Sequence, residues 1–386
     1  MKRQLGINAL LLAVDDTYRS AGVSTYIGQL LHQLPAVATD FELTAFVNRQ
    51  LGQTWAGLTL RRPPWSTNRP WARIVWEQTG LVRMARQARL DLLHGTVYAN
   101  PLLAPCPTVV TVHDLSFVHY PAMVRRFNRL YLRLVTRLTA RRAARVIADS
   151  ESTRCELLAW LALPAERVVA VPIAADERFM PAPAAAVEVF RRERGLPPRF
   201  MLFVGTLEPR KNLVRLVDAY AACQAQLADA PPLVIAGGRG WYYDEIFARV
   251  HAHGLQNRVL FPGFVPAAEL PWWYRAAEVF VYPSVYEGFG LPVVEAMASG
   301  TAVITSNTSS LPEVAGDAAI LVDPYDVEAL AGAMAQLSND PDLRRALSAA
   351  GVRQAAKFSW RRCAAETVEV YRAALGLAGQ PAEGPP

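Results

Sequence analysis

The sequence predicts an α/β protein with two doubly wound domains, and three observations lead to this fold class. The 386 residues exceed the usual size of one domain and suit two. An apolar fraction of 52% with 19% charged residues is enough to form large cores and excludes global disorder. Apolar runs alternate with longer amphipathic stretches along the whole chain, which is typical of parallel sheets covered by helices.

Six apolar runs in the first half are expected to be strands. Their hydrophobicity is continuous, as in parallel strands that are buried on both faces. The runs are INALLLAV (7–14), FELTAFV (41–47), LDLLHG (90–95), PTVVTVHD (107–114), RVIADS (145–150) and RVVAVPI (167–173). Helices are predicted between them at 24–34 and 125–145. The first run follows Lys2 and Arg3 as in a signal peptide, but two aspartates close it without a small-x-small cleavage site, which favours a strand.

The second half repeats this organisation. Its predicted strands are FMLFVGT (200–206), PLVIAGG (232–238), RVLFPG (258–263), VFVYPS (279–284), TAVITS (301–306) and AAILVD (318–323), with helices at 212–226, 292–298 and 327–337. Proline and alanine interrupt the pattern near 172–198. The expected organisation is a domain over 1–180, a domain over 181–360, a helix over 361–378 and a Gly/Pro-rich disordered tail over 379–386. Ligands of such sheets bind at the carboxyl ends of the strands, here in a central cleft.

Two classes of protein are disfavoured by composition. No apolar run reaches the ~20 residues that span a bilayer. Four widely spaced cysteines form no Cys-x-x-Cys, which argues against a zinc site or a disulfide framework and favours a cytoplasmic protein.

The string YEGFGLPVVEAMASG, residues 286–300, joins a predicted strand to a predicted helix. Glu287 ends the strand, two glycines loosen the turn, and Pro292 is well placed to begin the helix. Backbone N–H groups of the turn and the helix N-terminus favour an anion. Glu287 and Glu295 are carboxylates that can accept hydrogen bonds from sugar hydroxyls. For Glu295 alone, an acid that complements the helix dipole is the simpler explanation.

The string FVGTLEPRKNL, residues 203–213, has the same order of strand, turn and helix. Glu208, Arg210 and Lys211 lie in the turn. Adjacent Arg and Lys beyond a strand can hold a diphosphate, the guanidinium as a planar fork and the ammonium as a point charge. A solvated basic turn explains this pair equally well when the pair is taken alone.

Together with AGGRGW (236–241) and PGFV (262–265), these strings resemble the GT-B fold retaining glycosyltransferases of family four. Within that family they are similar to bacterial α-mannosyltransferases of O-antigen and exopolysaccharide synthesis. The resemblance covers roughly residues 5–375. It implies two Rossmann-like domains that face a central cleft, with a C-terminal helix that returns to the N-terminal domain. The N-terminal domain would bind the acceptor and the C-terminal domain the nucleotide sugar.

The resemblance also implies roles for individual residues. Arg210 and Lys211 would hold the diphosphate, and Glu295 would hold the ribose hydroxyls. The donor sugar would contact Glu287 and the backbone after it, and the base would lie near 263–265. The implied donor-binding residues are Gly22, Glu208, Gly263, Phe264, Val265, Gly288, Phe289, Gly290, Leu291 and Glu295, and the implied catalytic residues are His113, Arg210, Lys211 and Glu287.

The string TVVTVHDLSFVHYP, residues 108–121, brings His113 and Asp114 to the end of a predicted strand. A lone histidine usually satisfies a polar position in the core. The string resembles the His-Asp element of the family, however, whose histidine contacts the donor sugar. We therefore assign His113 to the reaction centre and Asp114 to the acceptor side. His94 also ends a strand and is a further candidate for the acceptor pocket.

The string AGVSTYI, residues 21–27, corresponds to the glycine turn of the family. A glycine between strand and helix lets a phosphate approach the helix N-terminus. The family usually has more glycines and an Arg before the Tyr, where this chain has Ser24 and Thr25. Only the backbone of Gly22 is therefore carried over as a donor contact.

The N-terminal half also carries a predicted basic surface. Residues 1–180 hold 22 basic and 13 acidic residues, against 18 and 21 over 181–386. Arginines recur along 125–145, and along 61–78 they alternate with tryptophans, among which Trp76 is also a candidate on the acceptor side. Arg with Trp is typical of an interfacial membrane contact, here with anionic lipid. A helix with one buried and one solvated face is the simpler explanation, and nucleic acid is least favoured because no nucleic-acid-binding motif is present.

The sequence thus predicts a metal-independent glycosyltransferase that needs no cofactor, since no Asp-x-Asp motif stands at a strand end. The resemblance implies transfer with retention, from GDP-mannose to a glycan or lipid-linked glycan of the cell surface. A cytoplasmic protein, peripheral on the inner face of the cell membrane, is expected. A nucleotide-sugar epimerase of the same fold and a non-catalytic glycan-binding subunit remain alternatives.

Overall fold

A computed structural model describes residues 2–13, 21–121, 126–227 and 229–377. The predicted tail over 379–386 and Arg125 lie outside these residues. The chain divides into two compact units, each with one parallel sheet. The first unit is Met1–Ile173 with Trp360–Pro386, and the second is Ala174–Ser359.

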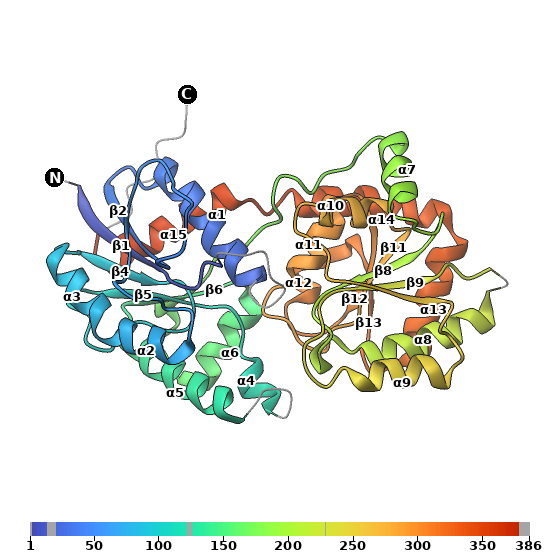
Figure 1. The fold of residues 1–386 in the computed structure, drawn as a ribbon, viewed down its shortest axis with the longest axis horizontal. Helices are drawn as coiled ribbons and strands as arrows, with labels where there is room; N and C mark the ends of the chain where they lie inside the picture. Colours follow the sequence, from blue (N-terminus) through green and yellow to red (C-terminus); the bar gives the residue numbers. More distant parts are fainter. Residues whose placement is uncertain (1, 14–20, 122–125, 228, 378–386) are drawn as a thin grey trace. The chain divides into compact units, whose positions relative to one another are not determined.

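The first unit contains a seven-stranded parallel sheet with strand order β3-β2-β1-β4-β5-β6-β7. Its strands are β1 (Arg3–Ala9), β2 (Phe41–Val47), β3 (Leu58–Arg61), β4 (Leu92–Gly95), β5 (Thr108–Val112), β6 (Arg145–Ala148) and β7 (Val168–Ala170). Its helices are α1 (Ala21–Val37), α2 (Pro70–Gln78), α3 (Gly80–Gln87), α4 (Ser116–His119), α5 (Arg126–Arg142), α6 (Glu151–Leu161) and α15 (Trp360–Ala374). Figure 1 shows helices on both faces of this sheet. The strand order reverses between β1 and β4, which is where doubly wound sheets bind ligands.

Three boundaries in this unit differ from the sequence expectation. The first strand covers Arg3–Ala9 instead of 7–14, because these seven residues pair one by one with β2. The edge strand β3 was not expected, since its four residues are half-exposed and lack a continuous apolar run. Helix α5 ends at Arg142, and Arg145 instead begins β6, where it pairs with Val109 of β5.

The second unit contains a six-stranded parallel sheet with strand order β10-β9-β8-β11-β12-β13. Its strands are β8 (Met201–Val204), β9 (Leu233–Ala236), β10 (Val259–Gly263), β11 (Val279–Tyr282), β12 (Ala302–Ser306) and β13 (Ile320–Val322). Its helices are α7 (Ala184–Glu193), α8 (Leu213–Gln226), α9 (Asp244–Ala252), α10 (Leu270–Ala276), α11 (Leu291–Ala298), α12 (Leu311–Ala315), α13 (Val327–Asn339) and α14 (Pro341–Ala355). All six strands expected in this half are confirmed. Strands β9, β11 and β12 are buried over their whole length, as continuous hydrophobicity predicts.

The first unit ends at Ile173, before the boundary expected at 180. The segment after it belongs to the second unit, where the Arg275 guanidinium donates to the carbonyls of Arg178 and Met180, both at 2.6 Å. Helix α15 belongs to the first unit and packs on α1, which confirms the expected return of the C-terminal helix. Its Arg372 donates two hydrogen bonds to Asp40, at 3.0 and 2.9 Å.

Within the described residues, no helix has both the length and the apolar character that crossing a membrane requires.

Candidate active site

Four charged side chains meet at the carboxyl ends of the two central strands of the second sheet. Arg210 and Lys211 lie in a single turn of 3₁₀-helix after β8, and Glu287 follows β11. The carboxylate of Glu287 contacts Arg210 Nη1 at 2.5 Å through one oxygen and Lys211 Nζ at 2.6 Å through the other. Glu208 accepts from Arg210 Nη2 at 2.9 Å. The sequence strings at 203–213 and 286–300 are therefore halves of one ionic cluster.

Tyr282, the last residue of β11, is a member of this cluster that the sequence analysis missed. Lys211 donates to its hydroxyl at 2.6 Å, and the hydroxyl donates to Glu287 Oε1 at 2.9 Å. Its position could have been noticed in the sequence, because Tyr282 is the only polar side chain of the strand VFVY and stands at the carboxyl end of that strand. A buried ammonium held by a carboxylate and a phenol has a fixed position, as electrostatic catalysis requires.

Burial and charge act in opposite directions on Glu287. Burial alone would raise the pKa of its carboxyl, but Arg210 and Lys211 lower that pKa to about 2. Burial, together with the Arg210 charge, lowers the pKa of Lys211, while Glu287 opposes this shift. Glu287 is therefore an anion at neutral pH, with Lys211 buried beside it and Arg210 partly exposed.

Glu295 has different surroundings, although it belongs to the same string. It lies on α11, is 8% exposed, and accepts a hydrogen bond from the Tyr274 hydroxyl at 3.0 Å. Burial raises the pKa of Glu295 to about 8, and the Tyr274 hydrogen bond only partly opposes this. Tyr274, on α10, was not singled out from the sequence. The raised pKa of Glu295 favours the protonated acid at neutral pH.

The turn between Glu287 and α11 is fixed by backbone geometry. Gly290 has φ +106°, and a Cβ there would lie 2.7 Å from Leu311 Cδ2, so the position requires glycine. Ser310 donates to the carbonyls of Glu287 and Phe289, at 2.9 and 2.8 Å. The implied donor-binding backbone over 288–291 thus has one defined conformation, followed by Pro292 in the first turn of α11.

The predicted base-binding stretch follows β10. Gly263 is the last residue of β10, Phe264 is 39% exposed and Val265 is buried. An exposed aromatic ring at the carboxyl end of a strand can stack on a nucleobase.

In the first unit, His113 lies at the carboxyl end of β5 with both ring nitrogens bonded. Nδ1 contacts Asp149 Oδ2 at 2.7 Å, and Nε2 contacts the Thr96 carbonyl oxygen at 3.0 Å. Because a carbonyl only accepts, Nε2 carries a proton. Burial would lower the pKa of His113, but Asp149 raises it. The pair therefore binds a proton between the ring and the carboxylate.

Asp149 was missed by the sequence analysis. It follows β6, and since Val112 of β5 pairs with Ala148 of β6, the next residue of each strand lies side by side. The run RVIADS contained this signal, a carboxylate directly after a buried strand.

The acceptor-side candidates lie in less open positions than expected. His94 is completely buried. Its Nδ1 bonds the Tyr371 hydroxyl at 2.8 Å and its Nε2 bonds the Thr111 hydroxyl at 2.9 Å. Burial lowers the pKa of His94 to about 3, so the ring is neutral. Trp76 is 5% exposed and packs on Trp65. The His94 and Trp76 side chains are therefore interior in the first unit, and both ring nitrogens of His94 have partners within the protein.

Asp114 and Gly22 have local surroundings that differ from each other. Asp114 Oδ1 accepts from the backbone N and the hydroxyl of Ser116, at 3.0 and 2.8 Å, and so forms an Asx turn just before α4. Gly22 is exposed in the first turn of α1, and a Cβ there would meet no atom within 4 Å. The fold itself does not require glycine at 22.

Two family profiles match the chain. The profile described as "Glycosyl transferases group 1" matches residues 187–354, and the profile described as "Glycosyltransferase Family 4" matches residues 20–179. The first match lies within the second unit and contains the ionic cluster. The second match contains His113 and Asp149.

Related proteins and structures agree with these profiles. The O-antigen chain mannosyltransferase B of Escherichia coli is 35% identical over 265 residues, which cover 68% of this chain and 70% of that protein. The serotype-specific mannosyltransferase WbdA of Escherichia coli is 31% identical over 278 residues, which cover 69% of this chain but 33% of that longer protein. The sucrose-phosphate synthase of Thermosynechococcus elongatus superposes with a TM-score of 0.79 at 22% identity, over 98% of this chain and 100% of that chain, and supports the fold. With its two parallel-sheet units and both profiles in order, the chain belongs to the GT-B fold glycosyltransferases of family four.

Proposed function

We propose that the protein transfers mannose from GDP-mannose, with retention of configuration, to a glycan or lipid-linked glycan in cell-surface polysaccharide synthesis. The observation that carries this proposal is the cluster of Arg210, Lys211 and Glu287 at the carboxyl ends of β8 and β11. The second unit would bind the nucleotide sugar and the first unit the acceptor. The similarity to O-antigen mannosyltransferases supports the choice of sugar.

In this reaction the cluster of Arg210, Lys211 and Glu287 would stabilise the nucleoside diphosphate as it leaves. The acceptor hydroxyl oxygen forms a bond to the anomeric carbon while the bond from that carbon to the β-phosphate oxygen breaks. The electron pair leaves with the nucleoside diphosphate, whose oxygen takes the acceptor proton. Arg210 and Lys211 would interact with the charge that grows on the phosphate, and Glu287 holds both cations in place before the substrate arrives.

Product analysis tests the reaction class. The purified chain, supplied with GDP-mannose and a panel of methyl glycosides, should release GDP and form a disaccharide with the α configuration. Epimerised nucleotide sugar without a disaccharide would assign the chain to the epimerases instead. Absence of both products over a full donor panel would leave a glycan-binding protein as the better account.

The nucleotide itself is tested by binding. GDP should raise the unfolding temperature more than UDP does at equal concentration, since a ligand that binds the native state at 100 times its Kd stabilises it by about 2.7 kcal/mol. UDP-sugars are the alternative donors, because a diphosphate clamp does not distinguish the bases. Stronger protection by UDP would overturn the choice of GDP-mannose.

Metal independence is part of the same proposal. Arg210 and Lys211 supply two fixed positive charges where many nucleotide-sugar enzymes use a divalent cation. Turnover should persist in excess chelator. Turnover that stops with chelator and returns only with Mg²⁺ or Mn²⁺ would contradict this assignment.

We also propose that the first unit attaches peripherally to anionic membrane at the inner face of the cell membrane. Burial raises the pKa of Tyr131 on α5, and α2 lies close enough that its Glu77 and Arg73 also act on this pKa. Each helix also exposes an apolar pair one turn apart. Trp71 is 63% and Val75 52% exposed on α2, while Leu130 is 70% and Leu134 58% exposed on α5. Exposed Arg133 and Arg137 lie on α5 as well. Exposed apolar and basic side chains on the same helices are typical of an interfacial contact.

Vesicle co-sedimentation tests this attachment. Binding should need anionic lipid and weaken with salt, because a basic side chain near the surface contributes about 1 kcal/mol. Leu134→Glu should weaken binding, whereas Val189→Glu, at an exposed apolar position of α7 in the second unit, should not. Sedimentation that ignores lipid charge, salt and Leu134 would contradict the proposal.

A further inference from the structure

The turn that carries Arg210 and Lys211 ends at Asn212, whose backbone is in the left-handed region. Asn212 has φ 61° and ψ 32°, and it lies between the 3₁₀ turn Pro209–Lys211 and helix α8. Among residues with a side chain, asparagine is one of the few that adopt this conformation readily. Because a left-handed residue separates two right-handed segments, the turn does not continue into α8, and the two cations are directed independently of that helix.

The side chain of Asn212 is buried, with 4% of the residue exposed, and both of its polar atoms are bonded. Its Nδ2 donates to the carbonyl of Pro283 at 3.1 Å and to the carbonyl of Pro324 at 2.6 Å. Its Oδ1 accepts from Arg215 Nη1 at 3.0 Å. Since carbonyl oxygens only accept hydrogen bonds, the amide nitrogen must face the two prolines. A carboxylate of the same size could not make these bonds.

The bonds of Asn212 join the ends of three strands. Asn212 belongs to the segment after β8, Pro283 directly follows β11, and Pro324 lies two residues after β13. In the sheet β11 is the neighbour of β8, whereas β11 and β12 both lie between β8 and the edge strand β13. A backbone bond adds to this link, since the Val285 N–H donates to the Arg210 carbonyl at 3.0 Å. The turn with the two cations is thereby fixed to the loop that follows β11.

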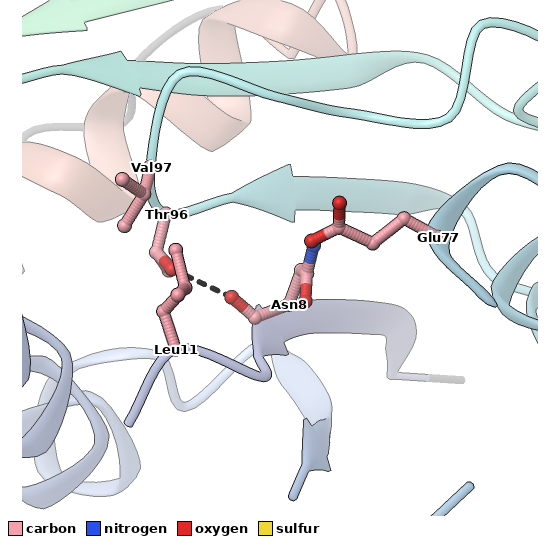
Figure 2. Close-up of a pocket in the computed structure, with 5 residues that line it drawn as sticks. All are labelled: Asn8, Leu11, Glu77, Thr96 and Val97. Carbon is pink, nitrogen blue, oxygen red and sulfur yellow. Dashed lines mark hydrogen bonds between the residues drawn. The ribbon is translucent and has the colours of Figure 1, made fainter. Parts of the chain in front are cut away.

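Another buried asparagine, Asn8 in the first unit, makes a simpler connection. Figure 2 shows its side-chain amide directed at the Glu77 carboxylate, and Asn8 Nδ2 donates to Glu77 Oε1 at 3.2 Å. Asn8 thus joins strand β1 to helix α2. Asn212 instead joins three strand ends at the place where the charged side chains of the second unit meet.

We propose that Asn212 is a positioning residue, which holds Arg210 and Lys211 in the geometry in which both contact Glu287. The inference rests on the proposed function, in which these cations stabilise the departing diphosphate, and it adds the residue that sets their direction. The Asn212 amide bonds backbone carbonyls of other loops, so its action on the cations passes through the backbone. Electrostatic stabilisation requires charges that are fixed before the reaction, and a misplacement of ~1 Å can cost about 10²-fold in rate.

Asn212→Gly tests this role in initial-rate assays with GDP-mannose and the best methyl glycoside of the panel. Glycine keeps the left-handed backbone and removes the amide. The variant should lower kcat by about 10- to 10²-fold and change the donor KM much less, because the lost interaction is strongest in the transition state. Asn339→Gly, at an exposed asparagine that ends α13, is the matched control and should leave both constants unchanged.

Asn212→Asp distinguishes an amide donor from a side chain that only fills space. Aspartate has nearly the same size and also adopts the left-handed conformation, but its oxygens would face the carbonyl oxygens of Pro283 and Pro324. The loss of kcat should therefore be at least as large as in Asn212→Gly. A smaller loss in Asn212→Asp would show that the amide is not what the site requires, and would overturn the inference.

A double-mutant cycle with Arg210→Ala shows whether Asn212 acts through the cations. Asn212→Gly should lower kcat several-fold less in the Arg210→Ala background than in the wild-type background. A purely structural role would lower the unfolding temperature and multiply the two losses of kcat in full, and that result would overturn the inference. If Asn212→Gly does not fold, Arg215→Ala, which removes the donor to Asn212 Oδ1, should give a smaller loss with the same dependence on Arg210.

Binding of GDP tests the inference without sugar transfer. GDP should raise the unfolding temperature of Asn212→Gly less than that of the wild type, because its β-phosphate would meet misplaced cations. Equal protection of the two proteins would overturn the inference. A wild type that GDP protects, but that transfers no sugar to any glycoside of the panel, would instead contradict the proposed function.

Discussion

The carboxyl ends of the two sheets carry polar groups of different kinds. In the second unit, full charges are in contact, since Arg210 and Lys211 both bond Glu287 at 2.5 and 2.6 Å. In the first unit, His113 binds a proton with Asp149, and Glu77 bonds the neutral amide of Asn8. Preorganised charge is suited to a diphosphate whose charge grows during reaction, and carboxyl groups paired with a ring or an amide are suited to hydrogen bonds with hydroxyl groups.

The largest effect is expected from Arg210→Ala. Removal of one preorganised electrostatic partner typically lowers kcat by about 10²–10³-fold, and the donor KM should change much less. Steady-state kinetics with varied donor check this, with Arg249→Ala, at a half-exposed ion pair of the same unit, as control. A variant that changes only the donor KM would mean that Arg210 binds ground and transition states alike.

Arg210→Ala also leaves Glu287 and Glu208 with fewer partners. Removal of one member of a buried ion pair costs about 3–5 kcal/mol. Thermal unfolding should therefore accompany the kinetics, and assays should be run well below the lowered midpoint.

The two acids of the 286–300 string should respond to pH with opposite signs. The folded pKa of Glu287 is lowered from 4.5 to about 2, so its contribution is complete above 4.5 and is lost as pH falls toward 2. The folded pKa of Glu295 is raised from 4.5 to about 8, so stability falls as pH rises from 4.5 to 8. Each shift corresponds to a few kcal/mol, on the order of 1.4 per pKa unit.

Urea unfolding across this pH range measures both effects. Compared with the wild type, Glu287→Gln should remove stability above pH 4.5, and Glu295→Gln should gain stability as pH rises toward 8. Parallel pH profiles for the two variants would contradict the difference in their surroundings.

Asp149→Asn should lower kcat by about tenfold, the equivalent of one pKa unit of lost pairing with His113. Asn keeps a hydrogen bond to the ring but does not compensate an imidazolium, so the pKa of His113 should fall. The pH dependence of kcat reports this pKa. An unchanged profile with reduced stability would show that Asp149 only supports the fold.

The smallest effect on turnover is expected from Glu295→Gln. If Glu295 holds the ribose, it binds far from the reacting bond, so the variant should raise the donor KM several-fold and leave kcat at saturating donor unchanged. Tyr274→Phe, which removes the hydrogen bond at 3.0 Å, should change the donor KM in the same direction. Loss of turnover at saturating donor would place Glu295 in the reaction itself.

Much of the fold followed from local pattern. Strands such as VFVY and AVITS are buried over their whole length, and continuous hydrophobicity predicts this directly. The edge strand LTLR was not predicted, because its side chains are only partly buried and it therefore lacks a continuous apolar run. The first strand lies at Arg3–Ala9 and not at the predicted 7–14, because its bounds are set by pairing with β2 and not by the apolar run itself.

The candidate site was predictable only where one short string carries it. Arg210 and Glu287 come from recognisable strings, but Asp149 and Tyr282 obtain their partners from other elements. Asp149 contacts His113 because of the register of β5 and β6, which cannot be read from the sequence alone.

The central claim is that the second unit binds the nucleotide diphosphate and the first unit binds the acceptor. Thermal unfolding of the wild type, Arg210→Ala and Asp149→Asn, each with and without GDP, tests its nucleotide half most directly. GDP carries on its β-phosphate the full charge that develops during transfer, so Arg210→Ala should lose much of the protection by GDP even though its donor KM changes little. GDP should raise the unfolding temperatures of the wild type and of Asp149→Asn equally. Full protection of Arg210→Ala, with protection lost in Asp149→Asn, would contradict the account.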